Sequence, residues 1–242
     1  MHAAALVLVA VLYAGSLVTP MEGPVKAAAA AHGLALAGEP GGSKKLANFI
    51  RDGLRTPDVF ISVDPAIVRG LGDRVAASTT FASTSLGIGW SANSRFAAQL
   101  RAAAAGKRPL LAVLASRGIV LGRTDPQTDP KGVYTIQAMH LLGAAALLGG
   151  DANPAQIFPE EDLLARIDTG EIDAGFFYKT EALARGLHFI PLPGKAAMSD
   201  RIAYTLAIMR DAPHPAAARA FAAFVLHGAG RTLLTQAGLV YR

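Results

Sequence analysis

The chain of 242 residues is 52% hydrophobic and only 17% charged, which suits one large domain or two compact lobes and excludes a wholly disordered protein. It contains no cysteine, which excludes thiolate metal sites and cysteine nucleophiles. The net charge of +5 comes from scattered basic residues whose only adjacent pairs are Lys44-Lys45 and Lys107-Arg108, so we expect no nucleic-acid binding.

The apolar run Ala3–Ala14 near the start of the chain has two interpretations. It resembles the core of an export signal, but no Lys or Arg precedes it, as such a signal requires. We favour a buried first strand, because Val7, Val9 and Val11 alternate and the run leads directly into Ala14-Gly15-Ser16. If the protein is exported, we therefore expect its signal peptide to be absent from this chain.

Strands and helices are expected to alternate through the first ninety residues. Thr19 to Glu22 has the pattern of a capping box with Pro20 at the first helical position, and Gly33 is the expected end of that helix. Asp64, followed by Pro65, is a second expected N-cap at the start of a helix. The remaining expected elements are strands at 34–37 and 59–63, a helix from Ser43 to Asp52, and a Gly-rich crossing segment at 85–90.

The second half continues the alternation, which favours an α/β fold with mainly parallel sheets. We expect two lobes, formed by residues 1–88 with 202–242 and by residues 89–201. A single doubly wound domain is the alternative. The expected elements are an apolar stretch at 110–115, strands at 119–121, 172–178 and 201–209, helices at 130–148 and 159–167, and two helices within 214–237.

Sequence motifs of common enzymes are absent from the chain. It contains no GxSxG elbow, no GxxxxGK[ST] phosphate loop and no HExxH, and its six histidines lack the spacing of a metal site. No nucleophile and base pair stands out. These absences favour a binding protein over an enzyme.

Two serines follow strands at the points where helices begin. Ser16 follows the first strand, and Ser43 begins a helix behind two glycines. Backbone N–H groups at helix starts bind anions, and a serine hydroxyl adds another donor. In open α/β sheets, ligands bind at the carboxyl ends of strands, where these loops lie. The alternative is that both serines only cap their helices.

An ordered set of motifs resembles the molybdate/tungstate-binding proteins of ABC importers, especially their archaeal-type branch. The set begins with Tyr13-Ala14-Gly15-Ser16-Leu17, which resembles that family's AGSL start. The stretches that resemble its other motifs are Gly42-Ser43, Pro57–Asp64 (PDVFISVD), Gly122–Gly132 (GRTDPQTDPKG), Glu160–Leu164 (EEDLL) and Gly175–Lys179 (GFFYK). The resemblance implies a two-lobed periplasmic-binding-protein fold (type II) with the ligand cleft between its lobes.

The resemblance also implies which residues bind the anion. Ser16 and Ser43 would donate from one lobe. From the other lobe it implies Asp129, the backbone N–H of Lys131, Glu160 and Tyr178. The chain departs from the branch at Lys131, which replaces a cysteine, and at Phe177, which replaces a glutamate.

Carboxylates near an anion need a reason, because like charges repel. Asp129 before Pro130 is a good N-cap, and Glu160 after Pro159 suits the first turn of a helix, so both have a structural alternative. Their functional interpretation is that carboxylate oxygens coordinate the hard Mo(VI) or W(VI) centre and raise its coordination from four to six. Sulfur in sulfate accepts no such ligands, so the acids would select against sulfate.

We therefore expect an ABC-importer receptor for molybdate or tungstate, located in the periplasm or otherwise outside the cytoplasm. Its expected partner is a membrane permease, it would be a monomer, and it would need no cofactor besides its oxyanion ligand. One rival is a receptor for sulfate, phosphate or a small organic anion. Others are an enzyme acting on a phosphorylated substrate and the effector domain of a transcription regulator, although the chain offers no DNA-binding segment.

Overall fold

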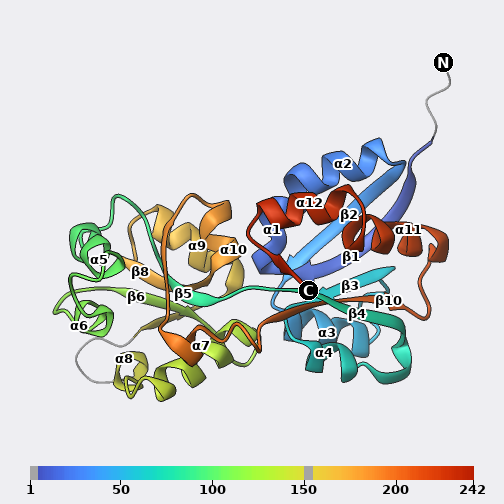
Figure 1. The fold of residues 1–242 in the computed structure, drawn as a ribbon. Coiled ribbons are helices and arrows are strands. Elements are labelled where there is room, and N and C mark those ends of the chain that lie inside the picture. The colour runs from blue at the N-terminus through green and yellow to red at the C-terminus, as the bar shows by residue number, and fades with distance from the viewer. Residues whose placement is uncertain (1–4, 150–154) are drawn as a thin grey trace. The chain divides into compact units, whose positions relative to one another are not determined.

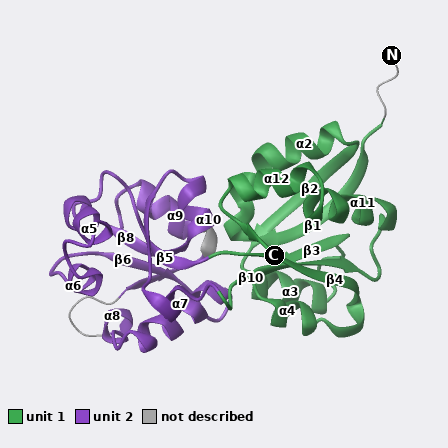
Figure 2. Ribbon diagram, viewed as in Figure 1, with its two compact units in different colours: residues 1–84, 200–242 green, residues 85–199 purple. Residues whose placement is uncertain are grey.

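A computed structural model describes residues 5–149 and 155–242 of the chain (Figure 1). The chain divides into two compact units (Figure 2). Unit 1 comprises Met1–Thr84 and Asp200–Arg242, and unit 2 comprises Ser85–Ser199. The expected boundary after residue 88 would cut a strand that pairs entirely within unit 2, so the division falls before that strand.

Within the described part of unit 1, six strands form one sheet in the order β11-β4-β10-β3-β1-β2. β1 runs parallel to β2 and β3, whereas β10 is antiparallel to β3 and β4, and β11 is antiparallel to β4. The strands are β1 (Val7–Ala14), β2 (Leu34–Gly41), β3 (Val59–Ser62), β4 (Val75–Ser83), β10 (Ala203–Met209) and β11 (Val240–Tyr241).

Helices cover both faces of this sheet, and Figure 1 shows α3 and α4 on the face opposite α2, α11 and α12. They are α1 (Val18–Pro20), α2 (Lys26–Ala31), α3 (Ser43–Arg51), α4 (Pro65–Arg69), α11 (Pro215–Leu226) and α12 (Ala229–Gln236). Short 3₁₀ turns lie at η1 (Gly15–Leu17) and η3 (Gly72–Arg74), and a π-helical turn lies at η2 (Met21–Val25).

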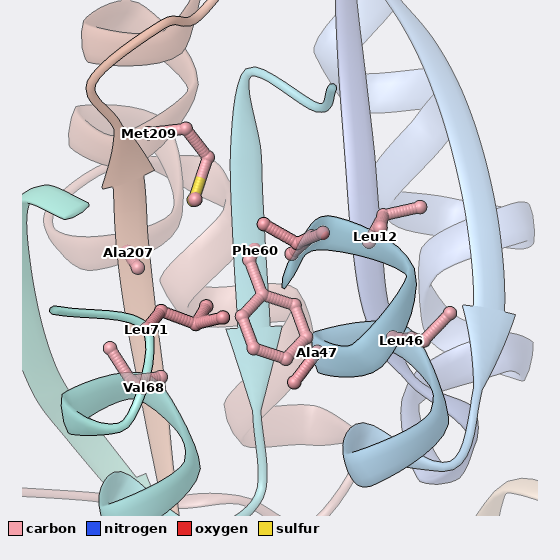
Figure 3. Packing of buried hydrophobic residues seen from close by; sticks show 9 residues of the cluster. Leu12, Leu46, Ala47, Phe60, Val68, Leu71, Ala207 and Met209 are labelled. Atoms are coloured by element: carbon pink, nitrogen blue, oxygen red, sulfur yellow. The ribbon is translucent and has the colours of Figure 1, made fainter. Parts of the chain in front are cut away.

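A buried apolar cluster holds α3 and α4 against the sheet (Figure 3). Leu12 of β1 and Phe60 of β3 project from the sheet, and Leu46 and Val68 meet them from the two helices. Burying such side chains contributes about 1.5–3 kcal/mol each. This packing fixes where α3 begins relative to the strands.

Within the described part of unit 2, five strands form a second sheet in the order β7-β6-β8-β5-β9. β6 is parallel to β7 and β8, whereas β5 is antiparallel to β8 and β9. The strands are β5 (Leu86–Trp90), β6 (Leu121–Thr124), β7 (Gln156–Phe158), β8 (Ala174–Tyr178) and β9 (His188–Pro191).

A second apolar cluster, which includes Leu163, Ile167 and Phe177, packs α9 and α10 onto this sheet. The helices are α5 (Ala97–Ala104), α6 (Leu110–Leu114), α7 (Pro130–Leu141), α8 (Ala146–Gly149), α9 (Glu160–Asp168) and α10 (Lys179–Ala184), with a 3₁₀ turn at η4 (Gly194–Ala197).

Several expectations about the sheets are wrong. Both sheets are mixed rather than mainly parallel, because the antiparallel partners β10 and β5 approach from distant parts of the chain. The expected crossing segment is the strand β5. Gly87 permits this pairing, since a Cβ there would lie 2.4 Å from the Ile190 carbonyl oxygen. β4 was not expected, and the strand expected at 119–121 lies at 121–124.

Two helix expectations also need correction. Thr19 lies inside α1, whose N-cap position is Leu17, so there is no capping box there. Glu22 instead accepts a hydrogen bond from the Tyr13 hydroxyl at 2.6 Å. The helix expected at 130–148 ends at Leu141, and Gly143 follows with a φ of 64°.

Candidate functional site

Both candidate serines lie just beyond the same edge of the unit 1 sheet. β1 and β2 are parallel neighbours in which Ala14 is paired with Gly41. Ser16 and Ser43 each lie two residues beyond this pair. The carboxyl ends of parallel strands meet at one edge, so the register places both serines at the edge where α/β proteins bind ligands.

Ser16 is buried in η1, with only 4% of its surface exposed. Its Oγ lies 2.9 Å from the Tyr204 hydroxyl, and either oxygen could donate in this hydrogen bond. Ser16 makes no side-chain capping bond, so the capping alternative is wrong for this residue. Tyr204 is a residue that sequence reasoning missed, because it lies 188 positions away and no local pattern connects the two.

Ser43 is the first residue of α3 and is 1% exposed. The N-cap position belongs to Gly42, and α3 has no side-chain cap, so Ser43 is not a cap either. Its Oγ accepts a hydrogen bond from the Val63 N–H at 3.2 Å. That bond uses a lone pair of the oxygen and leaves the hydroxyl proton for another acceptor.

The candidate residues of unit 2 also share one sheet edge. β7, β6 and β8 are parallel neighbours, with Thr124 paired to Phe158 and Gly122 paired to Gly175. Asp129 follows β6, Glu160 follows β7, and Tyr178 ends β8. All three residues therefore lie at the carboxyl edge of the parallel strands.

Asp129 caps helix α7. Its Oδ1 accepts a hydrogen bond from the Lys131 N–H at 2.9 Å, and the residue is 4% exposed. The Lys131 amide, expected to serve an anion, therefore binds the Asp129 carboxylate. Asp129 is thus the N-cap of α7, as its structural interpretation predicted. Because an ionised carboxylate accepts more than one bond, this geometry is compatible with a ligand role.

Glu160 begins helix α9 directly after Pro159 at the N-cap position. This placement agrees with the expected first turn, where a negative charge faces the positive end of the helix dipole. The side chain of Glu160 lies outside the described part of the structure.

Tyr178 occupies the N-cap position of α10 and is 1% exposed. Its backbone N–H donates to Glu181 Oε2 at 2.7 Å. Glu181 was missed in the sequence. An acid three residues after a strand end, at the third position of a helix, is the signal that could have identified it.

Lys131 and Glu181 form an ion pair whose side chains are completely buried. Lys131 Nζ donates to Glu181 Oε1 at 2.7 Å, and both side chains are 0% exposed. Nζ also lies 5.3 Å from the centre of the Phe177 ring. Lys131 and Phe177, the two departures from the resembled motifs, therefore contact each other.

A buried arginine precedes the Asp129 loop. Arg123 in β6 is 8% exposed, and burial lowers the pKa of its guanidinium although Asp125 opposes the effect. An arginine pKa is so high that the group stays charged at neutral pH. The loop thus begins at a buried positive charge.

Sequence comparison shows which family the chain resembles. A family profile described as bacterial extracellular solute-binding protein matches residues 9–240. A Haloferax volcanii protein, provisionally named an ABC transporter molybdenum-binding protein, is 32% identical over 166 residues. That match covers 67% of this chain but only 53% of the relative, so it spans about half of the relative's length. The expected resemblance is confirmed.

Comparison with solved structures confirms the expected two-lobed α/β class. The periplasmic molybdate-binding protein of Azotobacter vinelandii has a TM-score of 0.76 at 20% identity, covering 96% of this chain and 98% of that one. The sulfate-binding protein SubI of Mycobacterium tuberculosis has a TM-score of 0.69 at 16% identity, covering 96% and 86%. Among the residues that the structure describes, no helix is long and apolar enough to cross a membrane.

Proposed function

Because the chain belongs to the family of bacterial extracellular solute-binding proteins, we propose that it captures molybdate or tungstate for an ABC importer. In this proposal Ser16 and Ser43 of unit 1 and Asp129, Glu160 and Tyr178 of unit 2 contact one oxyanion. The backbone N–H of Lys131 completes the set, donating to the anion while it keeps its bond to Asp129 Oδ1. The loaded protein then delivers the anion to a membrane permease.

One observation carries the proposal. In each unit, the register of the parallel strands brings the candidate residues to the carboxyl edge of the sheet. The two serines are buried at this edge without serving as caps, and each hydroxyl can make a further hydrogen bond besides the one it makes within unit 1. The relative from Haloferax volcanii, named for molybdenum binding, supports the choice of anion.

The carboxylates supply the proposed selectivity. Mo(VI) and W(VI) are hard centres that accept additional oxygen ligands, whereas the sulfur of sulfate does not. Asp129 and Glu160 would coordinate the metal of the bound oxyanion and would repel sulfate. Their negative charge would thus favour molybdate and tungstate over sulfate.

A thermal-shift panel of oxyanions tests the proposal. A ligand that binds only the native state raises the melting temperature by mass action. We expect molybdate and tungstate at micromolar concentrations to raise it, and sulfate and phosphate to have little effect. An equal shift with sulfate would retain the receptor function but overturn the assignment to metal oxyanions.

The second candidate function is a receptor for sulfate or phosphate. The likeness of the fold to a sulfate-binding protein favours it, because hydroxyl and amide donors alone suffice for a tetrahedral anion. The same panel separates the two candidates. In both, we propose a periplasmic or comparable extracytoplasmic location, a monomeric receptor and a role without catalysis.

A further inference from the structure

The Lys131–Glu181 ion pair stands out among the charged groups that the proposed function does not use. Its Nζ to Oε1 distance is 2.7 Å, and neither side chain is exposed. By contrast, the ion pairs formed by Glu22, Glu39, Asp58, Asp168, Glu171 and Asp173 each have at least one side chain that is 38% exposed or more. Removing two charges from water costs free energy, so the burial of this pair needs a structural or functional explanation.

The pair connects two candidate ligand residues. Asp129 Oδ1 binds the backbone N–H of Lys131, and Lys131 Nζ binds Glu181 Oε1. Glu181 Oε2 in turn binds the backbone N–H of Tyr178. These three hydrogen bonds, joined through the side chain of Lys131 and the carboxylate of Glu181, link Asp129 at the start of α7 to Tyr178 at the start of α10.

We infer that Lys131 and Glu181 are positioning residues that hold Asp129 and Tyr178 in one fixed arrangement for the oxyanion. This inference rests on the proposed function. A site that is rigid before binding loses less conformational entropy when its ligand arrives, and its affinity rises accordingly. Lys131 also neutralises Glu181, which would otherwise place another carboxylate beside the candidate site and repel the anion.

The packing around the ammonium fits this role. Nζ lies 5.3 Å from the Phe177 ring centre and 5.6 Å from that of Tyr178, distances at which an aromatic face attracts a cation. Lys131 therefore contacts Tyr178 directly as well as through Glu181. The ammonium thus contacts two rings and one carboxylate.

The test compares Lys131→Met with the double variant Lys131→Met/Glu181→Gln by tungstate titration calorimetry and melting temperature. The single variant leaves a buried carboxylate without its cation, so we expect a lower melting temperature and very weak binding. The double variant removes both charges, while the amide that replaces the Glu181 carboxylate still offers an oxygen to the Tyr178 N–H. Its melting temperature should recover, but tungstate affinity should stay at least tenfold below that of the wild type.

The matched control is Arg55→Met/Glu39→Gln, which removes an ion pair of the same 2.7 Å length whose side chains are 50% and 37% exposed. It should bind tungstate like the wild type. A folded Lys131→Met/Glu181→Gln protein with wild-type affinity would overturn the inference and leave the proposed function intact. A wild type that binds neither tungstate nor molybdate would overturn both.

Amide hydrogen exchange of the wild type provides a test that needs no variant. Tungstate should slow exchange in both first turns, residues 129–134 and 178–183, because the pair couples them. Protection confined to one turn, or to neither, would contradict the coupling even if the double variant fails to fold.

Discussion

At the residue scale, the hydroxyl groups of Ser16 and Ser43 have defined partners within unit 1. Ser16 Oγ is 2.9 Å from the Tyr204 hydroxyl, and Ser43 Oγ accepts from the Val63 N–H. These bonds orient both oxygens without using them as helix caps. The sequence identified the serines but not their partners, because Tyr204 lies in β10 and Val63 directly follows β3.

Ser16→Ala and Ser43→Ala should each weaken tungstate binding. Loss of one good hydrogen bond to a charged ligand costs about 1.5–3 kcal/mol. Calorimetric titration measures the effect, and Ser116→Ala is the control, because Ser116 Oγ donates to the Ala112 carbonyl within its own turn of the chain. If the variants melt earlier but bind tungstate normally, the serines serve only the fold.

Asp129→Asn and Glu160→Gln separate coordination of the metal from a purely structural role. If the carboxylates bind the metal, each change should lower tungstate affinity at least tenfold, and the double variant should discriminate less against sulfate. If they are only helix-terminal acids near the anion, removing negative charge should leave binding equal or tighter. Tungsten X-ray absorption adds a second criterion, since four rather than six oxygen neighbours would contradict the ligand role.

Asp64→Asn is the matched control for Asp129→Asn. Both aspartates precede a proline and cap a helix through the backbone N–H two residues later, at 2.8 Å for Asp64 and 2.9 Å for Asp129. Asparagine caps helices about as well as aspartate, so neither change should cost much fold stability. Because Asp64 lies beside Val63, which bonds to Ser43, this control isolates the effect of the cap, and the tenfold loss of tungstate affinity is expected at Asp129.

At the element scale, the site depends on how closely helix starts approach the preceding loops. Gly132 in the first turn of α7 lies against the loop after β6. A Cβ there would be 2.6 Å from both the Thr124 carbonyl oxygen and the Pro126 nitrogen. Only glycine lets α7 begin so close to the loop that leads to Asp129.

Gly132→Ala should therefore destabilise the fold by about 1–3 kcal/mol, because backbone atoms must move to admit the methyl group. It should also weaken tungstate binding by displacing Asp129. Gly149→Ala in α8 is the control, since no atom lies within 4 Å of a Cβ at that position. Melting curves and tungstate titrations compare the two variants. Equal melting temperatures and affinities would show that the close approach at Gly132 matters neither for stability nor for binding.

At the scale of the whole molecule, the chain forms two units, and each contributes a sheet edge with candidate residues. Residues from both units can contact a single anion only in a conformation that brings them together. A ligand that binds one conformation preferentially shifts the population toward it.

Small-angle X-ray scattering with and without tungstate should show a smaller radius of gyration in the bound protein. Sulfate at the same concentration is the control anion and should leave the scattering unchanged. An unchanged radius with saturating tungstate would mean that the anion needs no rearrangement of the two units.

Local sequence patterns were sufficient to predict most helices and several strands of this protein. Asp64-Pro65 and Asp129-Pro130 begin helices where expected, because a cap and its backbone partner lie within two residues. The family resemblance carried by the ordered motifs also implied the two-lobed class, and the strand-to-helix pattern placed Ser16 and Ser43 at a sheet edge. These features depend on short-range chemistry and on chain order, both of which the sequence displays directly.

Tertiary structure alone decided the strand directions and the pairing of distant side chains. The Gly-rich run at 86–90 pairs as a strand because β8 and β9 approach it from elsewhere in the chain. Ser16 meets Tyr204 across 188 positions, and Lys131 meets Glu181 across 50. Such contacts form because burial in a packed core brings remote segments together, and no local pattern specifies which segments will meet.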